Sequence, residues 1–272
     1  MSTPLLYILD TLIRNEYQPS NLNMSRSKPF LPILLLFLAA LGNIITKINA
    51  SYLYHTCTSS DNYTMNSLYD SNLKQALDRL TNSAPPSGFG LSSTGGRDSQ
   101  NQVNGLALCR GDVSPADCKT CIATARQEIQ QRCPYKKGAA IWYDSCLLKY
   151  SNAKFFGKNQ NGGFRFYLVN VHEADDPTSF KEQVKNLLSG LSEMAKTSKN
   201  LYAIGDLEIG SSKKLYGLVQ CTRDLWTADC KKCLDDAIAE LPYCCANGAK
   251  VGGRVVGGSC NFRYETYPFF SA

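Results

Sequence analysis

Cysteine is the residue type whose spacing most plainly carries chemistry in this sequence. The pattern C-x8-C-x2-C occurs twice, 112 residues apart, first at Cys109, Cys118 and Cys121 and again at Cys221, Cys230 and Cys233. A C-x2-C pair can bind zinc, act as a redox dithiol, or contribute its two sulfurs to structural disulfides. The pattern therefore leaves three kinds of site to choose between.

Structural disulfides are the favoured interpretation. The chain has only two histidines, His55 and His172, and neither lies beside the cysteine cluster, which disfavours zinc. Redox catalysis needs a cysteine at a helix N-terminus, whereas Cys118 and Cys121 fall inside a predicted helix. The twelve cysteines all follow position 56, and their even number fits complete pairing in an oxidising compartment.

The text around the cysteines repeats with them. The segment GLALCRGDVSPADCKTC aligns with GLVQCTRDLWTADCKKC, so we predict an internal repeat of two tandem globular domains. The expected boundaries are an upstream extension plus signal peptide at 1–50, a first domain at 51–157, a linker at 158–163 and a second domain at 164–272.

An apolar run near the N-terminus predicts secretion. Residues 30–41 are nearly all apolar and follow the basic start 24–28, as in a signal peptide, with cleavage expected after Ala50. Residues 1–23 precede this natural start, and an upstream start codon is favoured over a functional extension. The mature chain is expected to be extracellular, in the apoplast, without a membrane span. Removing four basic and two acidic residues lowers the net charge from +6 to +4, which argues against a nucleic-acid partner.

Periodicity predicts an α+β fold in which two helices per repeat cover one face of an antiparallel sheet. The expected helices are 67–82, 115–132, 177–196 and 227–241. The expected strands are 51–57, 89–93, 103–109, 139–143, 145–150, 164–171, 202–207, 214–221, 250–256 and 259–264. Ser114 is the expected N-cap of the second helix. Trp226 stands at the corresponding position of the second repeat, with Thr227 as the alternative cap.

Several motifs resemble the plant cysteine-rich repeat secretory proteins, which are built from the salt stress response/antifungal, or ginkbilobin-homologous, domain. They are the two cysteine segments above with WYDSCLLKYSN, LPYCC and GGRVVGGSCNFRYETYPF, and the resemblance spans about residues 51–269. It implies two tandem domains, each with two helices on a five-stranded antiparallel sheet and stabilised by disulfides.

The resemblance also implies a disulfide pairing. The implied pairs are Cys57–Cys133, Cys109–Cys118, Cys121–Cys146, Cys221–Cys230 and Cys233–Cys260. Cys244 and Cys245 have no counterpart in the first repeat. A bridge between these neighbours, two free thiols, and a bond outside the domain all stay open. Asn62 lies in a sequon, N-Y-T, and is the expected glycosylation site.

Ginkbilobin binds mannose through an Asn, an Arg and a Glu, and the resemblance carries these roles to Asn170, Arg254 and Glu265 of the second repeat. Arginine donates and glutamate accepts hydrogen bonds from adjacent sugar hydroxyls. The competing interpretation is a salt bridge between Arg254 and Glu265 across the last hairpin. In the first repeat the corresponding residues are Thr58, Ala140 and Ser151, which predicts that its site is lost.

Four aromatic residues could stack on a sugar or simply pack in the protein: Trp142, Tyr143, Tyr264 and Tyr267. No catalytic constellation, metal site or cofactor is predicted, so we expect a non-enzymatic binding protein of the stress and defence class. Mannose-containing glycans are the first expected partner. A module that docks on receptor ectodomains, or a thiol-based redox sensor, are the alternatives.

Overall fold

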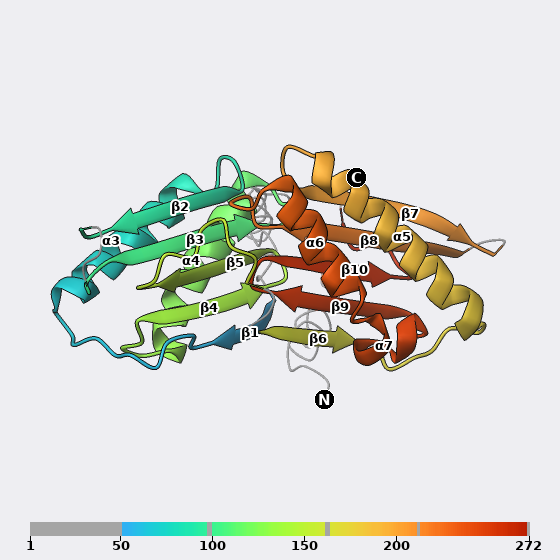
Figure 1. Ribbon diagram of the computed structural model, residues 1–272, viewed down its shortest axis with the longest axis horizontal. Coiled ribbons are helices and arrows are strands. Elements are labelled where there is room, and N and C mark those ends of the chain that lie inside the picture. The colour runs from blue at the N-terminus through green and yellow to red at the C-terminus, as the bar shows by residue number, and fades with distance from the viewer. Residues whose placement is uncertain (1–50, 97–99, 161–163, 211–212, 271–272) are drawn as a thin grey trace, which may run out of the picture. The chain divides into compact units, whose positions relative to one another are not determined.

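Each repeat folds into one five-stranded antiparallel sheet with two long helices on one face (Figure 1). The computed structural model describes residues 51–96, 100–160, 164–210 and 213–270. The expected signal peptide, cleavage point and upstream extension fall outside these residues, and the expected linker is described only as far as Gln160. The α+β fold predicted from the sequence is confirmed in both repeats.

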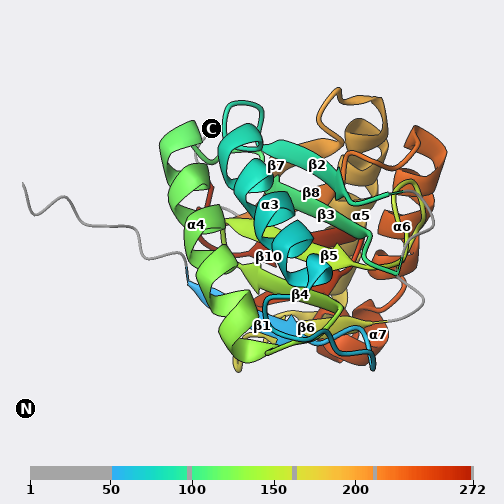
Figure 2. The same cartoon turned by 90° about the vertical axis from the view of Figure 1, so that its left-hand side faces the viewer.

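The first sheet has the strand order β1-β4-β5-β3-β2. Its elements are β1 (Tyr52–Thr56), α3 (Leu68–Ser83), β2 (Phe89–Thr94), β3 (Val103–Cys109), α4 (Pro115–Arg132), β4 (Gly138–Tyr143) and β5 (Cys146–Ser151). Figure 2 shows α3 and α4 side by side against this sheet.

The second sheet repeats that order as β6-β9-β10-β8-β7. Its elements are β6 (Arg165–Val169), α5 (Pro177–Thr197), β7 (Tyr202–Ile209), β8 (Lys213–Cys221), α6 (Thr227–Ile238), α7 (Leu241–Cys244), the short 3-10 turn η1 (Ala246–Gly248), β9 (Gly252–Gly257) and β10 (Cys260–Glu265). In Figure 1, α5 and α6 lie over this sheet. Among the described residues no helix is long and apolar enough to cross a membrane.

The helices lie on the sheets because each has an apolar stripe at helical spacing. In α3 the side chains of Leu73, Ala76, Leu77 and Leu80 are at most 1 % exposed. Ser67 begins this helix by accepting a hydrogen bond from the backbone N–H of Asp70. Such amphipathic helices gain most of their stability from packing on the sheet.

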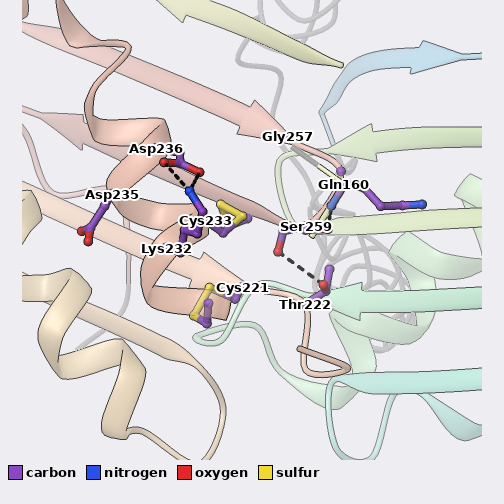
Figure 3. The surroundings of a disulfide bond; sticks show 12 residues. Gln160, Cys221, Thr222, Lys232, Cys233, Asp235, Asp236, Gly257 and Ser259 are labelled. Carbon is purple, nitrogen blue, oxygen red and sulfur yellow. Dashed lines mark hydrogen bonds and ion pairs between the residues drawn. A yellow bond between two sulfur atoms is a disulfide. The ribbon is translucent and has the colours of Figure 1, made fainter. Parts of the chain in front are cut away.

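Disulfides fix α4 and α6 to their sheets. The structure contains the five bonds Cys57–Cys133, Cys109–Cys118, Cys121–Cys146, Cys221–Cys230 and Cys233–Cys260. Figure 3 shows the second repeat, where Cys221 and Cys233 attach α6 to β8 and β10 beside a hydrogen bond between Thr222 and the Ser259 carbonyl.

The sixth disulfide joins the neighbours Cys244 and Cys245, whose Cα atoms are 3.8 Å apart. This is one of the three outcomes that the sequence left open. The Cys245 side chain is fully buried, and a Cβ added at Gly253 would come within 2.8 Å of its sulfur. Gly253 therefore permits the α7 turn to pack directly on β9.

The capping prediction for α6 needs correction. Ser114 caps α4 as expected, accepting from the backbone N–H of Asp117 at 3.1 Å. Trp226 occupies the N-cap position of α6 with nearly the same backbone angles, but no side chain caps this helix. Thr227 does not replace Ser114, because it is the first helical residue rather than the cap.

The two repeats bury a shared apolar cluster on the sheet faces that do not carry helices. Its buried members are Leu106, Leu108, Ala140, Trp142, Leu147, Phe155 and Val256. Side chains alternate along a strand, so β3 gives Ala107 to the helix side and its neighbours Leu106 and Leu108 to this cluster. The first sheet is therefore covered on both faces.

Hydrogen bonds also join the two repeats at this contact. Trp142 Nε1 donates to the Gly257 carbonyl at 3.3 Å, and Gln220 Nε2 donates to the Cys109 carbonyl at 3.0 Å. Lys149 Nζ donates to the Gly258 carbonyl at 2.6 Å. The Lys149 side chain is buried, and this burial lowers the pKa of its ammonium to about 8.

Candidate functional site

The three residues expected to bind a sugar line one groove on the second sheet. Asn170 directly follows β6, Arg254 lies in β9, and Glu265 is the last residue of β10. Strand pairing places Leu168 opposite Arg254 and Gly252 opposite Glu265, while the backbone N–H of Asn170 donates to the Gly252 carbonyl at 2.9 Å. We call this open hollow of about 420 Å³ the Arg254 groove.

Glycine is required at the floor of the Arg254 groove. A Cβ atom at Gly252 would overlap the Oε2 atom of Glu265. The missing side chain therefore lets the Glu265 carboxylate approach Gly252 closely, in the groove that Arg254 and Asn170 also line. Gly252 is thus needed for the close approach of the Glu265 carboxylate to β9.

The expected salt bridge between Arg254 and Glu265 is wrong. Arg254 Nη2 instead donates to Asp144 Oδ1 at 2.6 Å, and Glu265 Oε1 accepts from Arg263 Nε at 2.9 Å. Arg263 and Glu265 are two residues apart on β10 and so share one face of the sheet. Arg254 extends toward Asp144, which belongs to the first repeat.

Asp144 lies in the turn between β4 and β5 and forms ion pairs with three arginines. Its carboxylate accepts from Arg110 Nη1 at 2.8 Å, from Arg254 at 2.6 Å and from Arg263 Nη1 at 3.3 Å. Burial alone would raise the pKa of Asp144, but the positive charges of Arg254, Arg110 and Arg263 outweigh it and hold that pKa below its usual value. Burial also lowers the pKa of Arg254, and the charge of Asp144 opposes this shift.

The arginine cluster is balanced in charge. Arg110 also binds Asp112 with two hydrogen bonds of 2.6 and 3.0 Å, and Arg263 binds Glu265. Three guanidinium groups therefore meet the three carboxylates of Asp112, Asp144 and Glu265. The groove itself is lined by Arg254, Arg263, Asp144 and Glu265, two positive and two negative side chains. Without a net charge it suits a neutral polyhydroxyl ligand better than an anion.

Asn170 is anchored by its own backbone and keeps part of its amide available. Its Oδ1 accepts from the backbone N–H of His172 at 3.0 Å. Within the part of the chain that the structure describes, its Nδ2 has no hydrogen-bond partner. The groove therefore offers a donor at Asn170, a donor at Arg254, and carboxylate acceptors at Glu265 and Asp144, all of which a sugar hydroxyl can use.

The corresponding positions of the first repeat are used for other purposes. Ala140 is 4 % exposed and belongs to the apolar cluster between the repeats. Ser151 Oγ accepts from the backbone N–H of Ala153. Thr58 packs at Gly138, where an added Cβ would lie 2.7 Å from its hydroxyl. These residues offer no charged donor or acceptor to a sugar.

Of the four aromatic residues that sequence singled out, three pack inside the protein. Trp142, Tyr143 and Tyr264 are at most 4 % exposed, so packing is their role. Tyr267 is 49 % exposed and lines the Arg254 groove. Its hydroxyl accepts from Arg263 Nη2 at 3.0 Å, which holds the ring in place.

Asp144 and Arg263 are site residues that sequence reasoning missed. Arg263 could have been found, because it shares the face of Glu265 at a spacing of two along β10. Asp144 gives no such signal, since it lies 110 positions before Arg254 and reaches the groove through the contact between repeats.

The cysteines of the described residues form disulfide bonds. Cys118 bonds Cys109 and Cys121 bonds Cys146, so the two members of this C-x2-C pair are not bonded to each other. Every described cysteine is in a disulfide, and no group of three or more His, Cys, Asp or Glu side chains there could hold a metal ion. Asn62 of the sequon is exposed, and its glycosylation stays a prediction.

Comparison with known proteins points to one family. The family model for salt stress response/antifungal domains matches residues 56–153 and 169–267. The chain is 58 % identical over 223 residues to an antimicrobial ginkbilobin-2-like protein of Castanea crenata, covering 82 % of this chain and 90 % of that one. It is 49 % identical over 244 residues to cysteine-rich repeat secretory protein 38 of Arabidopsis thaliana, covering 89 % and 94 %. Its fold is similar to the tandem DUF26 ectodomain of an Arabidopsis thaliana cysteine-rich receptor-like protein, with a TM-score of 0.70, 27 % identity, and coverage of 80 % and 100 %.

Proposed function

Because the chain belongs to the salt stress response/antifungal family, with two copies of the domain, we propose that it is a secreted binding protein of the stress and defence class whose Arg254 groove takes a mannose-type sugar. Relatives named as antimicrobial and as secretory support the first part. The observation that carries the second part is the meeting of Asn170, Arg254 and Glu265 in one open groove.

The groove has the chemistry that a hexose needs. Adjacent hydroxyls of a sugar each donate and accept, so a carboxylate beside an amide and a guanidinium can hold two neighbouring hydroxyls at once. Arg254 is already bound to Asp144, and a sugar hydroxyl would use its remaining N–H groups. Asp144 thereby fixes the direction of the guanidinium before the ligand arrives, which lowers the entropy cost of binding.

Asn170→Ala and Glu265→Gln test the groove. Asn170→Ala removes a neutral hydrogen-bonding group, worth about 0.5–1.5 kcal/mol, and Glu265→Gln removes the charge of an acceptor, worth about 1.5–3 kcal/mol. In titration calorimetry we expect the affinity for methyl α-mannoside to fall roughly 2- to 12-fold in Asn170→Ala and roughly 10- to 150-fold in Glu265→Gln. Arg254→Ala is a poorer test because it also removes a partner of Asp144.

Ser151→Ala is the matched control, since Ser151 holds the position of Glu265 in the first repeat. This variant should bind as the unmodified chain does. Absence of any measurable heat with the unmodified chain would sink the sugar-binding proposal.

A second candidate function, docking on a receptor ectodomain, is favoured by the edge strand β6. Tyr167, Leu168 and Val169 are 38–41 % exposed there, and an edge strand has backbone groups available for pairing. Surface plasmon resonance against a panel of purified plant receptor ectodomains would test it. Binding that is lost in Leu168→Asp, while Glu265→Gln binds normally, would favour this function over the first.

A further inference from the structure

A second, larger hollow opens beside the Arg254 groove. It has a volume of about 950 Å³ and lies at the end of the second sheet where α5 begins and where β10 ends. Figure 1 shows the start of α5 and the β7–β8 hairpin at this same end. Its lining includes Ser179, Gln183, Tyr216, Thr266 and Tyr267, and we call it the Gln183 hollow.

The two hollows meet at Tyr267, which lines both of them. On either side of this residue the linings continue along the chain. Glu265 of the Arg254 groove is followed by Thr266 of the Gln183 hollow, and Gly252 of the groove is preceded by Val251 of the hollow. The start of β9 and the end of β10 thus lie between two hollows that share Tyr267 in their linings.

Tyr267 is suited to the boundary between two sugar units. Its ring is half exposed, and its hydroxyl is held by Arg263 at 3.0 Å. A held aromatic ring presents an apolar face with a polar tip, and a sugar ring likewise has an apolar face and a hydroxyl rim. One unit can lie over the ring while its neighbours occupy the two hollows.

Gln183, one of the residues that line the hollow, has an acceptor that lacks a donor. Its Nε2 donates to Ser179 Oγ at 3.1 Å, whereas its Oε1 is buried and has no hydrogen-bond partner. A buried acceptor without a partner is rare in folded proteins. Rotation of this side chain into the hollow would let a sugar hydroxyl donate to Oε1.

The charged side chains that line the Gln183 hollow are satisfied within the protein. The ion pairs, with their N–O distances, are Lys213–Asp175 at 2.9 Å, Lys214–Asp206 at 2.8 Å and Lys250–Glu173 at 3.1 Å. Asp176 caps α5 by accepting from the backbone N–H groups of Thr178 and Ser179. No uncompensated charge is left to recruit an anionic or cationic ligand, so a neutral ligand is favoured.

We propose that the ligand is a neutral oligosaccharide, which extends from the Arg254 groove across Tyr267 into the Gln183 hollow. This inference rests on the proposed function, because it places the first sugar unit at Asn170, Arg254 and Glu265. A single mannose would fill only one of the two parts. The volume of the Gln183 hollow falls within the range of sites that enclose whole small ligands.

Titration calorimetry of the full chain with methyl α-mannoside and with an α-linked mannopentaose tests the inference. The pentaose should bind at least 10-fold more tightly. Gln183→Met, which keeps the side-chain length but removes the acceptor, should remove most of this gain and leave methyl α-mannoside binding unchanged. Tyr267→Ala should weaken the pentaose more than the monosaccharide.

Matched controls keep these results separate from folding defects. Gln75→Met, on the corresponding helix of the first repeat, and Tyr243→Ala, at an exposed tyrosine of α7, should bind both sugars normally. Gln183→Met should melt no lower than the unmodified chain, because it removes an unsatisfied buried atom. Equal affinity for the two sugars, or equal loss of both in Gln183→Met, overturns the extension while the proposed function stands. No binding of either sugar overturns both.

Discussion

Asp144 is the residue on which the candidate site most depends. It comes from the first repeat, yet its carboxylate orients Arg254 and Arg263 of the second. These arginines stand opposite each other across β9 and β10, where two like charges repel. The carboxylate of Asp144 binds both guanidinium groups, which offsets this repulsion and fixes the two donors in place.

Asp144→Asn should therefore destabilise the protein by about 3 kcal/mol, as expected when one partner of a largely buried ion pair is removed. Urea unfolding at pH 7 measures this change. The control is Asp78→Asn, because Asp78 pairs with Arg126 but its side chain is 56 % exposed. That substitution should cost less than about 1 kcal/mol, as is usual for surface ion pairs.

The same residue makes stability depend on pH. The pKa of Asp144 is lower in the folded protein than in the unfolded chain, so its contribution is present above the unfolded pKa of about 4 and is lost as the pH falls through the folded pKa. The difference in unfolding free energy between the unmodified chain and Asp144→Asn should shrink below about pH 4. A difference that stays constant down to pH 2 would contradict this assignment.

At the scale of elements, the two repeats offer a direct comparison of helix capping. Ser114 and Trp226 have nearly identical backbone angles, and only Ser114 caps its helix. Trp226 is also 78 % exposed, so little packing depends on it. The second repeat therefore lacks a stabilising contact that its own fold permits.

Trp226→Ser should add the missing cap to α6 and stabilise the protein by about 1 kcal/mol, the usual worth of an N-cap serine. Thermal unfolding would show this as a rise in Tm. Ser114→Ala, at the matching position of α4, should lower stability by a similar amount. A fall in Tm for Trp226→Ser would mean that the exposed tryptophan has packing partners that outweigh the cap.

For the whole molecule, the contact between the repeats determines which sheet face is covered and which stays open to a ligand. The helix-free face of the first sheet is covered by the shared apolar cluster, including Ala140 and Trp142. On the second sheet, Arg254 and Glu265 remain at the border of this contact, beside an open groove. The described residues therefore contain one candidate sugar site, because the first repeat has Thr58, Ala140 and Ser151 at the corresponding positions and its sheet face is covered.

Lys149, which lies at the contact between the repeats, should make the protein more stable as the pH rises above about 8. Its folded pKa of about 8 lies below the value of about 10.4 in an unfolded chain, so the unfolded chain binds more protons between these values and stability rises with pH there. From pH 8 to 9.5 the unfolding free energy of the unmodified chain should rise by about 1.5 kcal/mol relative to Lys149→Met. Lys232→Met, at an exposed lysine, should show no such difference. Parallel pH profiles for the unmodified chain and Lys149→Met would refute the prediction.

The sequence by itself determined the local structure of this protein and its division into repeats. Cysteine spacing marked the two domains, and periodicity predicted α3, α4 and α5 and nearly all strands, because these depend on residues close in the chain. The resemblance supplied Arg254 and Glu265 by their distance from the last cysteine, and Asn170 as the nearest candidate for the third residue, which has no cysteine to anchor it.

Tertiary structure alone decided how those residues are used. Arg254 pairs with Asp144 rather than Glu265, and Cys244 bonds Cys245 rather than a distant partner. The first outcome depends on Asp144, which the packing of the two repeats brings to Arg254 from a distant part of the chain. The second was one of three outcomes that the sequence left open, and every other described cysteine has a partner in the fold. Binding chemistry is set by side chains that are near in space, and in this protein the decisive neighbour of Arg254 lies 110 positions away in the other repeat.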